Sequence, residues 1–287
     1  MRIAITGGNG HIGRCVVDLA LAQGHQVVSI DRTPSQSQDS GKANVGKANV
    51  EYVEADLTSY SALERSISGC DAIIHLAAIP SPRGSPDHEV HNNNVVGSYN
   101  ALSAAARLGI RRVCQASSAN ATGGAYSQWP RYDYFPLDEL HATYNEDAYS
   151  LSKWICEQQA DSFARRDTSM TIASLRFHWV VPDRATAARR RGDMGDIVVK
   201  HLWGYTTLDA AARACLLSVT ALFEGHETFY VVAPDTMMDE ASQNLRDRFF
   251  PAVPLMHELD GNQSFFSSAK AERLLGWSHS AVTAYAS

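Results

Sequence analysis

The stretch Thr6-Gly7-Gly8-Asn9-Gly10-His11-Ile12-Gly13 decides the fold that the rest of the chain must follow. It comes directly after a short apolar run at residues 3–6, which predicts a buried strand. It also opens residues 11–23, where apolar positions recur at helical spacing before a glycine stop. A strand, a glycine-rich turn and a helix in this order are typical of a turn that binds phosphate groups.

The three glycines of this turn have separate tasks. Gly7 permits the tight turn, Gly10 lets a pyrophosphate approach the backbone, and Gly13 lets the helix pack closely on the strand. The helix N-terminus adds amide donors and a favourable dipole. We therefore predict a dinucleotide at this turn, in contact with Gly7, Asn9, Gly10, His11, Ile12 and Gly13.

Acidic and basic residues at the next strand ends bear on which dinucleotide binds. Asp31 ends the predicted strand at 27–31, where a carboxylate accepts from the ribose hydroxyls of NAD and repels the 2′-phosphate of NADP. Arg32 beside it could instead hold that phosphate. We favour NAD and a solvated Arg32, with NADP as the alternative. Asp56 and Leu57, after the third strand, either hold the adenine or, through Asp56, cap a helix.

Strands and helices alternate through the first two thirds of the chain. Further strands are predicted at residues 49–53, 72–77, 113–117 and 171–177, and further helices at 95–108 and 148–166. This alternation predicts an α/β fold, a doubly wound parallel sheet of the Rossmann type with helices on both faces.

The last third is less regular, with helices predicted at 208–223, 239–249 and 269–275 and a strand at 229–232. These pieces are too few for a second independent core. We expect a small lobe over the carboxyl ends of the strands, where ligands of such sheets bind. The expected division is a dinucleotide-binding domain at residues 1–176, completed by parts of 205–232, and a substrate-binding lobe from 177–204 and 233–287.

Composition excludes several other classes of protein. The 287 residues are 45% hydrophobic and 20% charged, as in ordinary globular enzymes, and the net charge of −6 predicts no nucleic-acid partner. The mean hydropathy of −0.22 and the absence of a long apolar run argue against a membrane span. Five scattered cysteines fit neither a metal site nor a disulfide framework, and no signal peptide opens the chain, so we expect a cytoplasmic protein.

Beyond these features, the sequence resembles the extended short-chain dehydrogenases/reductases, also called the NAD-dependent epimerase/dehydratase family. The matching pieces lie in the family's order between residues 6 and 277: the glycine turn, Asp31, Asp56-Leu57, His75-Leu76-Ala77-Ala78, Asn94-Val95-x-Gly97-x-x-Asn100, Ser117-Ser118-Ala119, Tyr149-x-x-x-Lys153, Leu175-Arg176 and Lys270-Ala271-x-Arg273-x-Leu275-Gly276-Trp277. The resemblance implies that Leu76, Ala77, Ala78 and Asn94 contact the cofactor. It also implies a homodimer.

Three residues carry the expected chemistry. Tyr149 and Lys153 are four apart on a helix, so both face one side. A lysine cation lowers the pKa of a nearby phenol, which could then exchange a proton with a substrate oxygen as hydride moves. Ser118, at the end of the fifth strand, would orient that oxygen. The resemblance implies the same catalytic roles, and it adds that Lys153 holds the nicotinamide ribose.

Departures from the family pattern bear on the substrate. Markers common in nucleotide-sugar enzymes are missing around residues 176–182 and 205–212, and the shorter pattern looks more like the uronate-dehydrogenase-like members. We expect a small sugar or sugar acid, with Ser118, Asn120, Arg176 and His178 as candidate contacts and Arg176 pairing with a carboxylate. The alternative for Arg176 is a structural ion pair at a strand end. For His178 we favour the alternative of a histidine whose hydrogen bonds the lobe itself satisfies. The arginine cluster at 184–191 either caps an anionic substrate or forms a solvated loop.

The leading hypothesis is therefore an NAD(P)-dependent oxidoreductase acting on a secondary alcohol or ketone. Two alternatives remain at this point: a nucleotide-sugar epimerase, and a sensor protein that binds the dinucleotide without catalysis. The pair formed by Tyr149 and Lys153 argues against the sensor.

Overall fold

The computed structural model describes residues 1–33 and 49–280 of the chain. Its main sheet has the order β3-β2-β1-β4-β5-β6-β9, and every neighbouring pair of strands is parallel. The strands are β1 (Arg2–Thr6), β2 (Gln26–Asp31), β3 (Val50–Glu54), β4 (Ala72–His75), β5 (Arg112–Ser118), β6 (Thr171–Phe177) and β9 (Gly225–Val231). The predicted doubly wound α/β fold is confirmed. All these strands end at one edge of the sheet.

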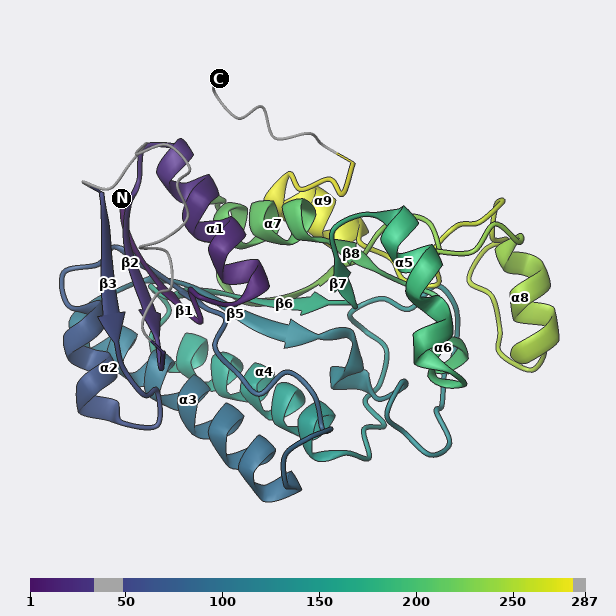
Figure 1. Ribbon diagram of the computed structural model, residues 1–287, viewed down its shortest axis with the longest axis horizontal. Coiled ribbons are helices and arrows are strands. Elements are labelled where there is room, and N and C mark those ends of the chain that lie inside the picture. Colours follow the sequence, from purple (N-terminus) through teal and green to yellow (C-terminus); the bar gives the residue numbers. More distant parts are fainter. Residues whose placement is uncertain (34–48, 281–287) are drawn as a thin grey trace.

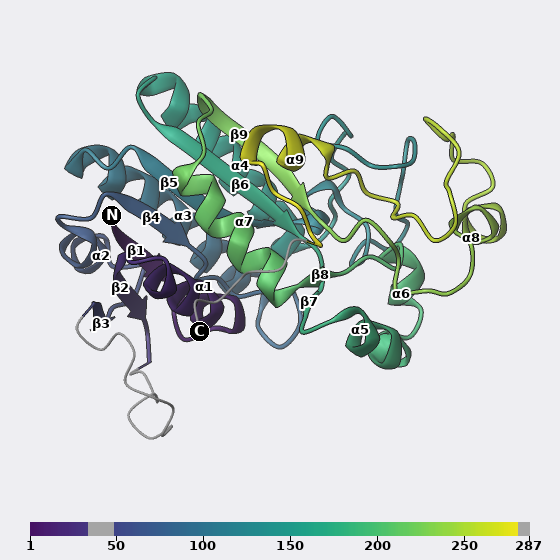
Figure 2. The ribbon, with the colours of Figure 1, turned by 90° about the horizontal axis from the view of Figure 1, so that it is seen from above.

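Helices cover both faces of this sheet (Figures 1 and 2). One face carries α1 (His11–Ala22), α7 (Leu208–Thr220) and α9 (Ala269–Leu275), and the other carries α2 (Tyr60–Ile67), α3 (Asp87–Leu108) and α4 (Ala148–Arg166). Side chains alternate along each strand, so Ile3 and Ile5 pack toward α1 while Ala4 packs toward α2 and α3. Burial on both faces explains why the strands are continuous apolar runs.

A smaller lobe lies beyond the carboxyl ends of the strands, at the right of Figure 1. It has its own apolar cluster, in which Phe135 packs against Phe265 and Trp203 packs against the same ring. Its elements are η1 (Ala119–Thr122), β7 (Val180–Val181), α5 (Arg184–Arg190), η2 (Arg191–Met194), α6 (Ile197–Lys200), β8 (Thr206–Thr207) and α8 (Ser242–Phe249).

Strands β7 and β8 pair with each other outside the main sheet, at the two ends of the segment that links β6 to α7. The chain leaves β6, forms β7, passes through α5, η2 and α6, and returns to β8 before entering α7. Val180 pairs with Thr206 and Val181 with Thr207, in parallel. The start and the end of this segment are therefore neighbours.

Most predicted elements coincide with observed ones, including the helix at 148–166, the strand at 171–177 and the helix at 269–275. Two predictions were incomplete. Helix α3 begins at Asp87 rather than at residue 95, because its first two turns are polar and lack the apolar periodicity on which the prediction rested. Helix α2 was missed because it is short and buries only Leu63 and Ile67.

The arginine cluster is helical, and the expectation of a loop there was wrong. Alanine and arginine are both good helix formers, and the Asp183 side chain caps α5 by accepting from the Thr186 N–H at 2.6 Å. The motif Gly-Lys-Ala-Asn-Val occurs twice in succession, at residues 41–45 and 46–50, and all but its last two residues lie outside the described part of the chain. Among the helices that the structure describes, none has the length and apolar character needed to cross a membrane.

Candidate active site

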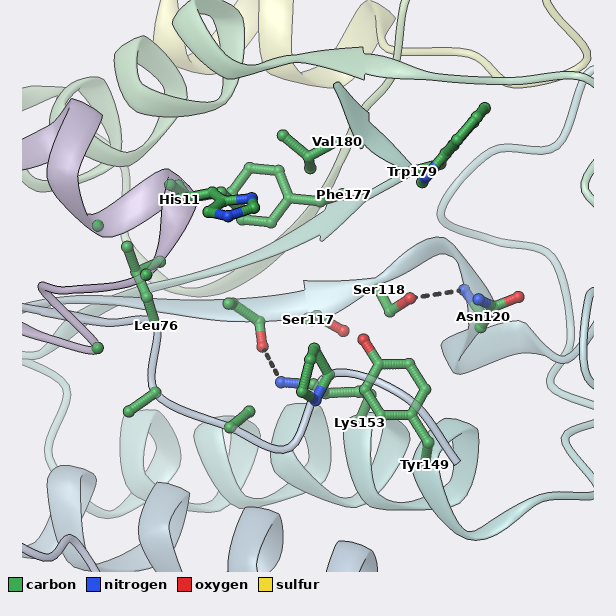
Figure 3. A pocket seen from close by; sticks show the side chains of 18 of the residues that line it. His11, Leu76, Ser117, Ser118, Asn120, Tyr149, Lys153, Phe177, Trp179 and Val180 are labelled. Atoms are coloured by element: carbon green, nitrogen blue, oxygen red, sulfur yellow. Dashed lines mark hydrogen bonds between the residues drawn. The ribbon is translucent and has the colours of Figure 1, made fainter. Parts of the chain in front are cut away.

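A cavity of about 660 Å³ opens at the carboxyl edge of the sheet, and most of the predicted site residues lie in its wall (Figure 3). The predicted residues in the wall are Gly7, Gly10, His11, Ile12, Gly13, Asp31, Arg32, Asp56, Leu57, Leu76, Ala77, Ala78, Ser118, Asn120, Tyr149, Lys153 and His178. Three predicted residues are outside it: Asn9, Asn94 and Arg176. Residues far apart in the sequence meet here because the parallel strands all end at this edge.

The glycine turn has no room for side chains. Gly7 has a φ of +70°, and a Cβ on it would come within 2.8 Å of the Ala77 nitrogen. A Cβ on Gly13 would come within 2.1 Å of the Gly7 carbonyl oxygen. Helix α1 begins after Gly10 with no side-chain cap and no acidic residue in its first turn, so its first amides can receive an anion. This turn therefore fits the pyrophosphate of a dinucleotide.

Asp31 is fixed at the adjacent strand end by the turn itself. The Asn9 N–H donates to one carboxylate oxygen at 3.1 Å, and the Thr33 N–H donates to the other at 3.4 Å. The Asn9 side chain donates to the Thr33 carbonyl at 2.7 Å. Asn9 thus positions Asp31 and is not itself part of the cavity wall, contrary to our prediction. Arg32 is exposed at the same end of the cavity.

Asn94 also has a supporting position rather than the predicted cofactor contact. Its side chain accepts from the Ile79 N–H at 2.8 Å and donates to the Ile79 carbonyl and to the Ser152 hydroxyl, each at 3.1 Å. These bonds tie the segment after β4 to α4 and so hold the wall residues Leu76 to Ala78 in place.

Asp56 lies in the wall, but it does not cap a helix. Its carboxylate accepts from the backbone N–H and the hydroxyl of Thr58, and these bonds lower the pKa of the carboxyl. The residue at the N-cap of α2 is Ser59. The helix-cap interpretation of Asp56 is therefore wrong.

Tyr149, Lys153 and Ser118 converge on the middle of the cavity (Figure 3). Tyr149 is in the first turn of α4, whose N-terminus is capped by the Asp147 side chain. The Lys153 ammonium donates to the Ala116 carbonyl at 2.7 Å and lies 5.8 Å from the centre of the Tyr149 ring. The Ser118 hydroxyl oxygen accepts from the Asn120 N–H at 3.1 Å.

Burial controls the ionisation of these groups. It raises the pKa of the Tyr149 phenol well above its ordinary value, although a hydrogen bond with the Ser118 side chain acts in the opposite direction. Burial also lowers the pKa of the Lys153 ammonium. Burial therefore shifts the phenol pKa in the direction opposite to the lowering that we expected from Lys153.

Arg176 forms a buried ion pair and lies outside the wall of the main cavity, which favours a structural role over the substrate contact that we expected. Its Nε and Nη2 donate to the two carboxylate oxygens of Glu157 at 2.9 and 2.8 Å, and the side chains are only 6% and 3% exposed. The Ser117 hydroxyl donates to the same carboxylate at 2.6 Å. The guanidinium thus neutralises a buried carboxylate, and it lines a separate cavity of about 520 Å³.

His178 lies in the wall, but the protein uses both of its ring nitrogens. Nδ1 accepts from the Trp179 N–H at 2.8 Å, so Nε2 carries the proton and donates to the His201 carbonyl at 2.8 Å. Burial lowers the pKa of His178 to about 4, which keeps the ring neutral. The predicted bond to a sugar hydroxyl therefore has no free ring nitrogen. The Asn120 side-chain oxygen similarly accepts from the Ala125 N–H at 3.2 Å.

Part of the wall was not predicted. The Tyr126 ring packs edge-on against the Tyr149 ring at 6.1 Å and against the His201 ring at 6.4 Å. Other unpredicted wall residues in this region include Arg83, Asp193, Met194 and Ile197. Arg190 is also in the wall, and it belongs to the arginine cluster that we considered as a cap for an anionic substrate. Around Arg83 the sequence signal was turn composition, where Ser-Pro-Arg-Gly-Ser-Pro follows a strand end.

The sequence and the fold of this chain are similar to those of many known proteins. The model of the NAD dependent epimerase/dehydratase family matches residues 3–197. A 2-alkyl-3-oxoalkanoate reductase of Stenotrophomonas maltophilia is 30% identical over 241 residues, which cover 78% of this chain and 67% of that protein. A putative UDP-glucose 4-epimerase of Methanocaldococcus jannaschii is 28% identical over 203 residues, which cover 70% of this chain and 63% of that one.

Among solved structures, a mutated uronate dehydrogenase superposes with a TM-score of 0.69 at 22% identity, over 98% of this chain and 82% of its own length. At this identity the likeness extends to the fold alone. The three similar proteins act, by their names, on an oxo acid, a nucleotide sugar and a sugar acid. The comparisons therefore do not select one substrate.

Proposed function

The chain belongs to the NAD-dependent epimerase/dehydratase family, and from this premise we propose an NAD(P)-dependent oxidoreductase that transfers hydride at a secondary alcohol or ketone. The substrate that we propose is small and sugar-like or a sugar acid. One observation carries the proposal: Ser118, Tyr149 and Lys153 share a single cavity with the glycine turn and Asp31. A proton carrier and a dinucleotide cradle in one cavity are what coupled proton and hydride transfer requires.

The cavity residues suggest how the dinucleotide is held. The first amides of α1 would bind the pyrophosphate, Asp31 the adenosine ribose, and Lys153 the nicotinamide ribose. Asp56 and Leu57 would lie beside the adenine. Bound NAD supplies the site that accepts or gives the hydride. The exposed Arg32 keeps NADP as the alternative cofactor.

The acid/base role that we propose falls to Tyr149. Because burial keeps the phenol protonated, it can donate to a carbonyl oxygen in the reductive direction. In the oxidative direction it would take the proton of a substrate hydroxyl while Ser118 hydrogen-bonds the reacting oxygen. Lys153, held by the Ala116 carbonyl, places its charge beside the ring. Dehydration is disfavoured because residues 119–121, Ala-Asn-Ala, offer no carboxylate next to Ser118.

The proposal extends to organisation. We assign residues 1–176 and parts of 205–232 to the dinucleotide domain, and residues 177–204 and 233–287 to the substrate lobe. The apolar cluster of the lobe supports the separate lobe, but it also includes Ala119, Tyr132, Phe135 and Leu137, so parts of residues 119–137 pack with the lobe rather than with the dinucleotide domain. A homodimer through α3 and α4 is consistent with their exposed apolar side chains Val96, Tyr99 and Leu151.

A nicotinamide absorbance assay tests the function. The purified chain is incubated with NAD or NADP and with neutral sugars, uronic acids, hydroxy acids and UDP-glucose, and the reverse reaction is run with NADH and 3-oxo acids. We expect a change in nicotinamide absorbance with a small substrate. Interconversion of UDP-sugars without net reduction would favour the epimerase instead. Tight NAD binding without turnover of any substrate would favour the sensor.

A further inference from the structure

Arg83 presents a cation to the cavity that no other described residue neutralises. It lies in the loop between β4 and α3, and its backbone N–H donates to the Ser81 hydroxyl at 3.0 Å. Its guanidinium makes no hydrogen bond or ion pair within residues 1–33 and 49–280. Its one recorded neighbour is the Tyr126 ring, whose centre is 6.0 Å from the guanidinium carbon.

Arg83 is also close to the reacting groups. The Tyr126 ring that it faces packs against the rings of Tyr149 and His201, so one aromatic ring separates Arg83 from the proposed proton carrier. Burial is the main cause of the lowered pKa of His201, and the nearby positive charge of Arg83 contributes to it. The guanidinium therefore acts electrostatically on this end of the cavity.

The charges of this end of the cavity favour an anion. Its charged wall residues are the cations Arg83, Lys153 and Arg190 and the carboxylate Asp193. Arg190 pairs with Asp193 at 3.3 Å, and Lys153 donates to a backbone carbonyl. At this end of the described wall, away from Arg32, Arg83 is thus the cation left available to a ligand.

We propose that Arg83 binds a carboxylate of the substrate and so makes the enzyme selective for acids. The inference rests on the proposed function and names the substrate class of the same site. A guanidinium can hold a carboxylate through two parallel hydrogen bonds, which fixes orientation as well as charge. A carboxylate fits better than a diphosphate, because one unpaired fork faces the cavity and the dinucleotide must share its 660 Å³. Arg83 replaces Arg176 in this role.

The test uses pairs of ligands that differ by the carboxylate: D-glucuronate with D-glucose, D-galacturonate with D-galactose, and 3-hydroxybutyrate with 2-butanol. Binding to the NAD-loaded protein is measured by calorimetry, and KM is measured wherever turnover occurs. The variants are Arg83→Gln, which removes the charge, and Arg83→Lys, which keeps the charge without the fork. Arg189→Gln is the matched control, because Arg189 is exposed on α5, outside the cavity wall, and bonds Thr186.

We expect the unmodified protein to bind the acid of at least one pair more tightly than its neutral partner. Arg83→Gln should weaken that acid about 10- to 100-fold, in line with the loss of a charge-assisted hydrogen-bonded contact, and should leave the neutral partner and NAD unchanged. The affinity of Arg83→Lys for the acid should lie between those of Arg83→Gln and the unmodified protein. Arg189→Gln should bind the acid as tightly as the unmodified protein.

Three outcomes would overturn the proposal: no preference for any acid, equal weakening of acid and neutral ligand by Arg83→Gln, or weakening of UDP-glucose alone, which would assign the guanidinium to a diphosphate. The binding measurement does not depend on turnover. If acids bind through Arg83 but no nicotinamide chemistry follows, the proposed function fails and the assignment of Arg83 stands.

Discussion

The two ends of the cavity are built in different ways. The inner end, which would hold the dinucleotide, is built mainly of backbone, namely a glycine turn, the first amides of α1 and the ends of β1 to β4, to which the side chains of Asp31 and Asp56 are added. The outer end consists of side chains brought together from Arg83, Tyr126, Trp179 and residues 190–201. A site made of backbone has a fixed residue spacing that a sequence displays. A site made of converging side chains has no such spacing, so only the folded structure reveals it.

Tyr149 lies between the two ends of the cavity. Removal of its hydroxyl should have the largest effect of the changes that we predict. Tyr149→Phe keeps the ring packed against Tyr126 and removes only the phenolic oxygen. Turnover should fall by about 10² to 10⁴, as when a positioned proton carrier is lost. Affinity for NAD, which the inner end sets, should change little. Steady-state kinetics and a cofactor titration measure the two quantities, and near-normal turnover would remove Tyr149 from the proposed role.

The buried ion pair of Glu157 with Arg176 lies outside the wall of the main cavity. Glu157→Gln leaves a buried guanidinium without its counter-charge, which should reduce the free energy of unfolding by about 3–5 kcal/mol. Replacing both partners with leucine should recover part of that loss. Urea denaturation measures the stability of each variant. Because Arg176 does not reach the substrate, the preference for acids over neutral ligands should not change in the leucine pair. Loss of that preference in the leucine pair would indicate that Arg176 contacts the substrate.

Low pH should destabilise the protein through the buried histidines of the outer end, His178 and His201. Burial lowers the folded-state pKa of His178 to about 4, below the value near 6.5 of the unfolded chain, and also lowers that of His201. Protonation therefore favours unfolding: the stabilisation is complete above about pH 6.5 and is lost as the pH falls toward 4. At pH 5 the loss attributable to His178 should be about 2 kcal/mol.

Urea denaturation at pH 7.5 and pH 5 measures this loss. His178→Gln should reduce the difference in stability between the two pH values. His257→Gln, at an exposed position, should leave that difference as it is. An equal acid loss in the His178 variant and in the unmodified protein would contradict the assignment.

The smallest expected effect is a change of cofactor preference at the inner end of the cavity. Asp31→Asn removes the negative charge that disfavours a 2′-phosphate while keeping the size of the side chain. The ratio of NAD to NADP affinity should fall about tenfold, roughly the effect of one charge-assisted hydrogen bond. Arg32→Gln is the reciprocal variant and should weaken NADP more than NAD. Fluorescence titration measures both cofactors, and tighter binding of NADP by the unmodified protein would reverse the assignment.

The sequence predicted the fold and the inner end because both rest on local patterns. The glycine spacing, the strand that ends at Asp31 and the four-residue separation of Tyr149 from Lys153 each fix a geometry within one or two elements. The polar side chains were harder. Whether Arg176 pairs with Glu157 or with a substrate depends on which neighbour lies closer in space, and α4 and β6 supply that neighbour only after folding.

The roles of Asn94 and His178 were hard to predict for the same reason. Both are polar residues beside the cavity whose hydrogen-bonding capacity the protein itself consumes. Arg83 could not be selected in advance, because an arginine in a turn is ordinarily solvated. Its significance comes from the ring of Tyr126, which follows it by 43 positions, and from the absence of a counter-charge among the described wall residues around it.

The pairing of β7 with β8 makes one part of the outer end, the segment at residues 182–205, interchangeable. The two strands lie side by side, about 4.8 Å apart, so the segment between them begins and ends at nearly one point. Lengthening or replacing a segment whose ends are already joined adds little closure entropy and moves neither α4 nor the glycine turn. Under the proposed function, this segment could therefore be exchanged to alter the outer end of the cavity without displacing Tyr149, Lys153 or the glycine turn.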